Sequence, residues 1–363
     1  MITQLNDIDE LNRELQKQPF DKNGWALYRF PDSETVQFIT GPIEKVGVGA
    51  NSKNGFIISP FNDQDEQGWQ IQNLITAQFN VKDPFEKLER LVFYHNSVDT
   101  VSTPKEDYCK LVEDILIEIA GQKLVKAVPA RTKYIESTKP FDPFPFYKSL
   151  LETYPNAFVY IISTPDTGTW IGCTPELLLK AKGDSIMTLS LAGTRKANNT
   201  ADPATKDLFS IKEIREQAIV TSYIKGILKK YCYDIAITGP DLIDAGNVYH
   251  LGTYFNATLN PDLHGNYLSL VRDLHPTPAV CGLPLNDSLE FLLQHENFDR
   301  SLYSGFLGPI SESGADLFVN LRCMQVHKDG FKLYAGAGVV EGSDPEKEWI
   351  ETEEKMNTLL RFI

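Results

Sequence analysis

The order of the expected strands and helices constrains the fold of this chain more than any other feature. Strand-type runs follow one another over residues 24–60, 157–195 and 303–336, without the strict alternation with helices that a doubly wound fold requires. Consecutive strands favour antiparallel pairing, because a hairpin can join them directly. The sequence therefore predicts an α+β fold with antiparallel sheet, built as one large two-layered domain.

Helical spacing and apolar runs predict where the main elements lie. A long helix is expected over 204–230 and another over 345–360, while the segments 124–131 and 315–326 each read as a strand. No motif stands out before about residue 100. The predicted organisation is an N-terminal portion, 1–100, and a portion that carries the chemistry, 101–363, within one structural domain.

The charge balance excludes several classes of partner. The chain has 35 Lys and Arg residues against 49 Asp and Glu residues, for a net charge of −14. Such a surface repels nucleic acid and anionic membranes, so neither is expected as a partner. An anionic small molecule would need a local cluster of basic residues or a metal ion. The apolar runs are too short to span a bilayer and no secretory signal is visible, so the cytoplasm is the expected compartment.

Zinc and disulfide chemistry are also disfavoured. The five cysteines are dispersed without a CxxC spacing, and the six histidines form no HExxH motif or close pair. These cysteines are expected to be small buried side chains in a reducing compartment.

Two expected helices carry pairs of glutamates at helical spacing. Glu213 and Glu216 lie at the start of a stripe that continues with apolar residues, which favours burial of both carboxylates. Buried carboxylates need a cation, and oxygen ligands suit a hard divalent ion. Glu348, Glu351 and Lys355 share one face of the last helix, where a solvated face or a favourable helix start is the alternative interpretation.

Lys126 and Glu176 are the two candidate acid–base residues. Each lies among apolar neighbours, where burial can favour a neutral lysine and a protonated glutamate. The alternative is that both are ordinary charges at strand edges. Glycine-bearing turns such as LAGTR and YAGAG lack the spacing of a nucleotide-binding loop, although their backbone N–H groups could approach a carboxylate.

Taken together, nine segments resemble the chorismate-utilising enzymes, a family that includes isochorismate, salicylate, anthranilate and aminodeoxychorismate synthases. They occur in the family's order and cover roughly residues 120–360. The segments are LVKAVPAR, CTPELLL, LAGTR, KEIREQAIV, VYHL, HPTPAVCGLP, YSGFLG, VNLRC and LYAGAGVVEGSDPEKEWIETEEK.

The resemblance implies a fold, a metal, a substrate and a set of site residues. The fold would be a large α+β domain with pseudo-twofold halves, antiparallel sheets in the core and helices outside. The metal would be Mg²⁺ and the substrate chorismate. Implied metal ligands are Glu216 and Glu351, with Glu213 and Glu348 flanking them, and the implied general acid is Glu176. Implied substrate-binding residues are Gly193, Thr194, His250, Thr277, Ala279, Tyr303, Arg322, Gly336, Gly338 and Lys355.

Within the family, the branches differ in the nucleophile that attacks C2 of the ring. The resemblance makes Lys126 the general base of the branches that add water, and Ser190 stands where the ammonia-using branches have proline. The expected activity is therefore isochorismate synthase, which serves menaquinone or siderophore pathways. Salicylate synthase, an ammonia-using synthase component and a silent chorismate-binding subunit are the alternatives. No glutaminase subunit is expected, and the assembly expected is a monomer or weak homodimer.

Overall fold

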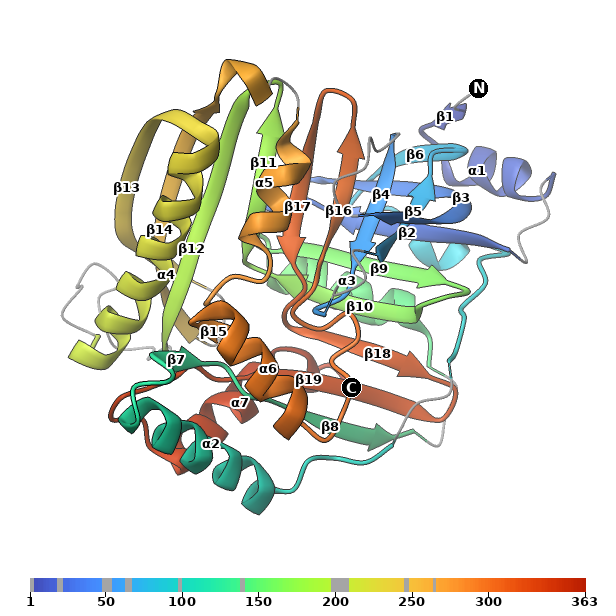
Figure 1. The fold of residues 1–363 in the computed structure, drawn as a ribbon. Coiled ribbons are helices and arrows are strands. Elements are labelled where there is room, and N and C mark those ends of the chain that lie inside the picture. The colour runs from blue at the N-terminus through green and yellow to red at the C-terminus, as the bar shows by residue number, and fades with distance from the viewer. Residues whose placement is uncertain are drawn as a thin grey trace.

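The computed structural model describes most of the chain (Figure 1). The described residues are 3–17, 22–47, 54–62, 67–96, 100–137, 141–196, 209–244, 248–263 and 266–363. The helices are α1 (Ile8–Leu15), α2 (Lys105–Ala120), α3 (Pro143–Thr153), α4 (Ile211–Tyr231), α5 (Tyr267–Leu274), α6 (Leu285–His295) and α7 (Pro345–Leu360), with short 3-10 turns η1 (Phe85–Lys87) and η3 (Pro261–Leu263).

Strands make up the centre of the molecule. They are β1 (Thr3–Leu5), β2 (Asn23–Arg29), β3 (Thr35–Gly47), β4 (Gly55–Ser59), β5 (Gln67–Gln72), β6 (Ile75–Asn80), β7 (Lys126–Ala127), β8 (Ala130–Glu136), β9 (Phe158–Thr164), β10 (Gly168–Thr174), β11 (Leu177–Lys182), β12 (Ser185–Lys196), β13 (Cys232–Asp244), β14 (Val248–Leu259), β15 (Gly282–Leu283), β16 (Phe306–Ser311), β17 (Gly314–Val319), β18 (Cys323–His327), β19 (Gly330–Gly336) and β20 (Val339–Val340).

The strands pair as the sequence predicted, because almost all neighbours are antiparallel. Strand β3 is long enough to join two sheets: its first half pairs with β2 and β6, and its second half pairs with β5. The first sheet runs β1-β6-β3-β2-β9-β10-β18-β19-β8, and β1–β6 is its parallel pair. The second sheet runs β5-β4-β16-β17-β11-β12-β14-β13. The predicted α+β class with antiparallel sheets in the core is confirmed.

Three apolar clusters define the layers. One cluster joins strands of both sheets, with Tyr28 and Phe158 from the first and Phe56 and Phe318 from the second. A second cluster packs α1, α3 and α7 against the first sheet, and a third packs α4 and α5 against the second. The order is helix, sheet, sheet, helix, so the prediction of two layers was wrong.

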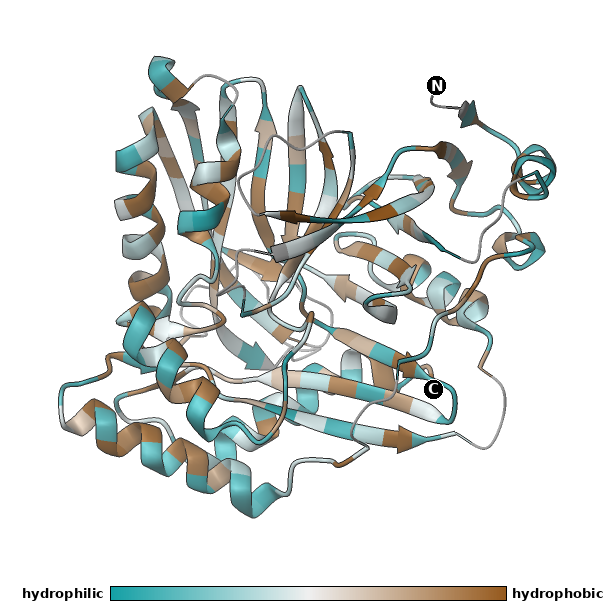
Figure 2. Ribbon diagram, turned by 45° about the vertical axis from the view of Figure 1, so that its right-hand side comes forward, coloured by the Kyte–Doolittle hydropathy of each residue, from teal (hydrophilic) through white to brown (hydrophobic). Residues whose placement is uncertain are grey.

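Strand burial explains the extra layers. All seven residues of β9 and all seven of β10 are buried, which requires cover on both faces of the first sheet. Brown, apolar segments accordingly recur along the strands in Figure 2, and the helices alternate between brown and teal segments. None of the described helices is long and apolar enough to cross a membrane.

Two expected strands are split. The segment 124–131 contains β7 and the start of β8, which belong to different sheets. The segment 315–326 contains β17 and β18, and the chain turns between them at Arg322, whose φ is +46°. The last helix has the predicted bounds, whereas α4 begins at Ile211 and the expected helical residues 204–208 lie outside the described ranges.

The N-terminal residues share the sheets of the rest of the chain. Strand β2 pairs with β9, and β4 pairs with β16, so strands from before residue 100 lie between later ones. A separate three-stranded sheet, β15-β7-β20, lies below the end of α4 in Figure 1. The pseudo-twofold relation of the two halves stays a prediction.

Candidate active site

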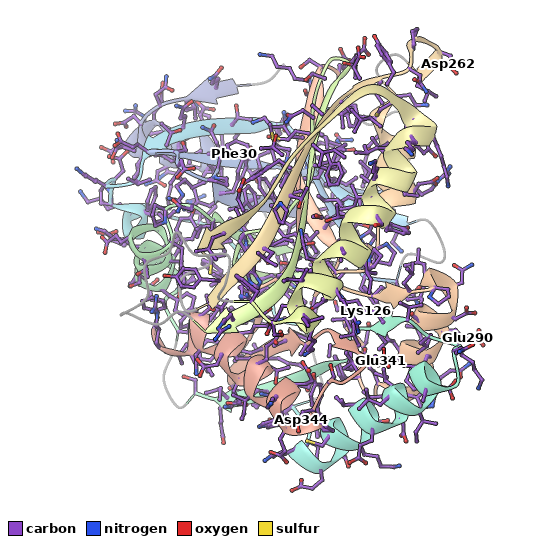
Figure 3. All side chains as sticks on the ribbon, turned by 90° about the vertical axis from the view of Figure 1, so that its left-hand side faces the viewer. Phe30, Lys126, Asp262, Glu290, Glu341 and Asp344 are labelled. Carbon is purple, nitrogen blue, oxygen red and sulfur yellow. The ribbon has the colours of Figure 1, made fainter. Side chains whose placement is uncertain are left out.

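Lys126 lies at the centre of the small three-stranded sheet. Its backbone pairs with Leu283 on one side and Val340 on the other, and its side chain is fully buried. The ammonium Nζ donates to Glu216 Oε1 of α4 at 2.9 Å. Figure 3 labels Lys126 beside the lower end of α4. The edge-strand interpretation of Lys126 was therefore wrong, because β7 is a central strand.

Gly338 lets the ion pair of Lys126 and Glu216 approach the backbone. A Cβ at this position would overlap Glu216 Oε1, and it would lie 2.8 Å from Glu216 Cδ and 3.2 Å from Lys126 Cε. Any side chain larger than hydrogen would displace one of the two charged groups. In this structure Gly338 leaves room for the Glu216 carboxylate, and its expected contact with substrate stays a prediction.

The other two carboxylates of the site come from α7, and each is also paired with a lysine. Glu348 accepts from Lys212 of α4, and Glu351 accepts from Lys355 at 2.7 Å. The helix α7 begins at Asp344, whose side chain accepts a hydrogen bond from the backbone N–H of Lys347. Glu348 and Glu351 are three residues apart and therefore face the same side, toward α4.

The two carboxylates of α7 differ in acidity. Burial raises the pKa of Glu348, and the negative charge of Glu351 raises it further, although Lys212 opposes both. Burial also acts to raise the pKa of Glu351, but the ion pair and hydrogen bond with Lys355, together with Lys212 and Thr194, hold it below its usual range. The pKa of Glu351 therefore lies below that of Glu348.

Glu213 lies in the first turn of α4, and its carboxylate takes part in the cap of that helix. Its side chain accepts from the backbone N–H of Ser210, and the Ser210 side chain accepts in return from the backbone of Glu213. This reciprocal pair is a capping box at the start of α4. Glu213 thus fixes the direction of the helix that carries Glu216, and its carboxylate is occupied by the cap.

Glu176 is buried in the short connection between β10 and β11. Its side chain is 4% exposed, and its backbone carbonyl accepts from Val319 N. Burial raises its pKa to about 7, although Lys126, Arg322 and Lys355 lower it. Glu176 is therefore close enough to interact electrostatically with Lys126 and Lys355, the lysines that pair with Glu216 and Glu351.

A chain of hydrogen bonds fixes His250 beside Arg322. His250 Nε2 lies 3.0 Å from Arg322 Nη2, and because arginine can only donate, Nε2 must be the unprotonated nitrogen. Nδ1 therefore carries the hydrogen and donates to the carbonyl of Gly193 at 3.3 Å, with Thr194 Oγ1 at the same distance. Burial and the charges of Arg322 and Lys355 hold the pKa of His250 well below its usual range.

The guanidinium of Arg322 is suited to bind an anion. The side chain is 7% exposed, and its Nε is buried with no hydrogen-bond partner among the described residues. A buried arginine without a carboxylate partner is costly unless a ligand neutralises it. Tyr303 is one of the groups that raise the pKa of Arg322, against the effect of burial. The Tyr303 hydroxyl lies close to Gly336, because a Cβ built on that glycine would be 3.2 Å from the hydroxyl oxygen.

Gly336 also receives Lys355 of α7. The Lys355 ammonium donates to the Gly336 carbonyl at 2.8 Å as well as to Glu351. Thr277 and Ala279, in contrast, form a turn of their own in which Thr277 Oγ1 accepts from Ala279 N at 3.2 Å. The structure therefore links Lys355, Glu351 and Gly336 directly, while Thr277 and Ala279 contact each other in the turn before β15.

Sequence reasoning missed three residues of this region. Lys212 pairs with Glu348. The sequence signal for this residue was its position: a basic side chain is disfavoured in the first turn of a helix, so a lysine there suggests an acidic partner. Glu296 and Arg300 form a buried pair whose signal was their i,i+4 spacing. Arg300 donates to the carbonyls of Val128 and Val280, so it ties the Lys126 segment to the segment of Thr277 and Ala279.

The carboxylates of α4 and α7 are the candidate ligands for a metal ion. Among the described residues, no group of three or more His, Cys, Asp or Glu side chains is arranged to hold a metal ion, and the lysines occupy the carboxylates instead. The donor set is nevertheless all carboxylate oxygen, and within the described ranges Glu348 Oε2 is buried without a hydrogen-bond partner. Oxygen ligands with unmet coordination fit a hard divalent cation.

Comparison with known proteins identifies the family. Residues 56–363 match the family model described as "Chorismate binding enzyme". The chain therefore belongs to the chorismate-binding enzymes, and the resemblance drawn from the nine segments is confirmed.

Similar members of the family carry the name isochorismate synthase. The chain is 33% identical to isochorismate synthase DhbC of Bacillus subtilis (strain 168) over 272 residues, which cover 71% of this chain and 68% of the relative. It is 29% identical to isochorismate synthase MenF of Escherichia coli (strain K12), over 99% of this chain and 84% of the relative. A solved structure of DhbC from Bacillus anthracis, a proposed 2,3-dihydroxybenzoate-specific isochorismate synthase, has a TM-score of 0.79 and 26% identity, and covers 97% of this chain and 99% of that one.

Proposed function

We propose that this chain is an isochorismate synthase, which converts chorismate to isochorismate by adding water at C2 and expelling the 4-hydroxyl. The names of its relatives support this activity. The single observation that carries the proposal is the burial, in one cluster, of a lysine and of a glutamate whose pKa is raised to about 7. Water addition needs a base and loss of a hydroxyl needs an acid, and these residues supply one of each.

Lys126 acts as the base in this proposal. It must lose its proton before it can accept one from water, and its ammonium now donates to Glu216. Glu176 acts as the acid, because a carboxyl with a pKa near 7 is substantially protonated at neutral pH and can give a proton to the departing oxygen. The two residues are expected on opposite sides of the substrate ring.

Chorismate carries two carboxylates, and the chain has net charge −14, so local cations must hold the substrate. Arg322 offers a buried guanidinium whose Nε has no partner in the described part of the chain, and such a group binds a carboxylate through a planar fork. Tyr303 adds a hydroxyl close to the same region. These two residues are proposed to bind one of the carboxylates.

Mg²⁺ is proposed as the metal, and Glu216 and Glu351 are proposed to hold it, with Glu348 beside them. When bound, it would polarise the ring carboxylate and so make the conjugated ring a better electron acceptor. Glu213 is proposed to act through the start of α4, because its carboxylate caps that helix.

Product analysis tests the proposed activity. Purified protein is incubated with chorismate and MgCl₂, and the products are separated by chromatography. Isochorismate as the main product supports the proposal. Salicylate with pyruvate would identify a salicylate synthase, an aminated product formed with ammonium would identify an ammonia-using synthase, and unchanged chorismate would indicate a silent binding subunit.

The Lys126→Gln variant separates catalysis from binding. It should still bind chorismate, because Arg322 and Tyr303 are unchanged, but it should fail to add water. Production of isochorismate at a near wild-type rate by this variant would refute the role of Lys126. We also propose that the enzyme acts in the cytoplasm without a glutaminase subunit, as a monomer or weak homodimer, and sedimentation of the purified chain tests its assembly.

A further inference from the structure

Lys212 and Glu348 form an ion pair that joins the first turn of α4 to the first turn of α7. The Glu348 side chain is 1% exposed, and its Oε1 accepts from the Lys212 ammonium. Its second oxygen, Oε2, is buried with no hydrogen-bond partner among the described residues. One oxygen of this carboxylate is therefore paired with lysine, and the other lacks the hydrogen-bond donor that a buried oxygen normally has.

The three lysine–glutamate pairs differ in how firmly the lysine is held. The Lys126 side chain is fully buried, and the Lys355 side chain is 13% exposed with a second hydrogen bond to a backbone carbonyl. The Lys212 side chain is 27% exposed. Lys212 is therefore the lysine of the three that can most readily move its ammonium into solvent.

The position of Lys212 in its helix also favours release. It is the second residue of α4, and the N-terminus of a helix carries a partial positive charge that repels a lysine. Lys212 contacts Glu348, and the negative charges of Glu216 and Glu351 also favour its charged form. The Lys212 ammonium is therefore stabilised by the nearby carboxylates, whereas the N-terminus of α4 repels it.

We propose that Lys212 is an exchangeable internal counter-ion that competes with a divalent cation for Glu348. The inference rests on the metal in the proposed function, since Glu348 lies beside Glu216 and Glu351. One carboxylate cannot hold both an ammonium and a divalent ion at full strength, because the two cations repel each other. Binding of the metal therefore weakens the Lys212–Glu348 pair and moves the Lys212 ammonium toward solvent.

The proposal predicts that removal of the lysine charge strengthens metal binding. Titration calorimetry with MgCl₂, at about pH 8 so that the carboxylates are ionised, compares wild type with Lys212→Met and Lys212→Arg. Lys212→Met should bind Mg²⁺ about tenfold or more tightly, because the competing charge is gone. Lys212→Arg should bind no more tightly than wild type, since arginine keeps the charge and forms a stronger fork with carboxylate.

Lys225→Met is the matched control, because Lys225 is an exposed lysine of the same helix. It changes the net charge equally and should leave the Mg²⁺ affinity unchanged. Equal or weaker Mg²⁺ binding by Lys212→Met would overturn the proposal and would indicate that Lys212 orients Glu348 for the metal. Absence of Mg²⁺ binding by the wild type would instead refute the metal in the proposed function.

Thermal unfolding gives a readout independent of activity and shows whether the variants fold. Without added metal, Lys212→Met should unfold at a lower temperature than wild type, because Glu348 remains buried and unpaired. Added MgCl₂ should raise its unfolding temperature by more than it raises that of wild type. An equal increase in the two proteins would contradict the competition.

Discussion

Glu176 gives the site a measurable pH dependence. Burial raises its pKa to about 7, and a general acid must be protonated, so the competent fraction falls as pH rises through about 7. We expect kcat to decrease on the alkaline side with that pKa. The Glu176→Gln variant should bind chorismate but turn over about 10²–10⁴-fold more slowly. Measurement of the rate against pH checks this, and an unchanged alkaline decrease in the variant would assign the titration to another group.

Gly338 offers a test of close packing at a single residue. The Gly338→Ala variant should lose most activity, because its Cβ would overlap Glu216 Oε1 and crowd Lys126. Gly226→Ala is the matched control. Beyond its own helix backbone, no described atom lies within 4 Å of the place that a Cβ on Gly226 would take, so alanine should leave activity unchanged and stabilise α4 slightly. Steady-state rates and unfolding temperatures of both variants distinguish the site effect from a general effect of the methyl group.

For single residues, the sequence indicated the candidate catalytic and binding side chains, but not which partner each side chain contacts. Lys126 and Glu176 both have apolar neighbours in sequence, and both proved to be buried. Lys126 and its partner Glu216 are 90 residues apart, and Lys212 and Glu348 are 136 residues apart. Helical spacing places glutamates on one face of their own helix, but it contains no information on the element that lies opposite.

Among the elements, α7 brings three predicted residues into place from one helix start. Asp344 caps this helix by accepting from Lys347 N at 3.0 Å. The Asp344→Ala variant should lose about 1 kcal/mol of folding free energy, and it should also lose activity because Glu348 lies in the first turn. Asp7→Ala is the matched control, since Asp7 caps α1 in the same way through Glu10 N. Denaturant unfolding should show similar losses for both, while the chorismate assay should show a loss for Asp344→Ala alone.

Local chemistry decided which elements could be predicted. The helix α7 has its predicted bounds because Asp344 and Pro345 mark its start with a cap and a proline at the first position. The expected strand over 315–326 failed because the turn is made by Arg322 in a left-handed conformation, without a glycine or proline to signal it. That turn directs the guanidinium of Arg322, the proposed carboxylate-binding group, toward His250.

For the whole molecule, the succession of strands without intervening helices was sufficient to predict an antiparallel α+β fold, but it did not predict how many layers the fold has. Strand β3 crosses from one sheet to the other, and no local pattern indicates that a single strand has partners in two sheets. The N-terminal third carried no motif, and yet β2 and β4 supply partners for β9 and β16. Its contribution is to complete the sheets that hold the site residues.

This arrangement predicts that residues 101–363 cannot fold alone. Removal of residues 1–100 would leave β9 and β16 with unpaired edges and would expose the apolar cluster between the sheets, which includes Phe158 and Phe318. Unpaired edges and exposed apolar surface promote aggregation, so the truncated chain should be insoluble or should lack a cooperative unfolding transition. Co-expression of residues 1–100 as a separate chain should restore soluble protein, because the missing strands return as partners. A truncated chain that is soluble, unfolds cooperatively and converts chorismate would show that the N-terminal strands are dispensable.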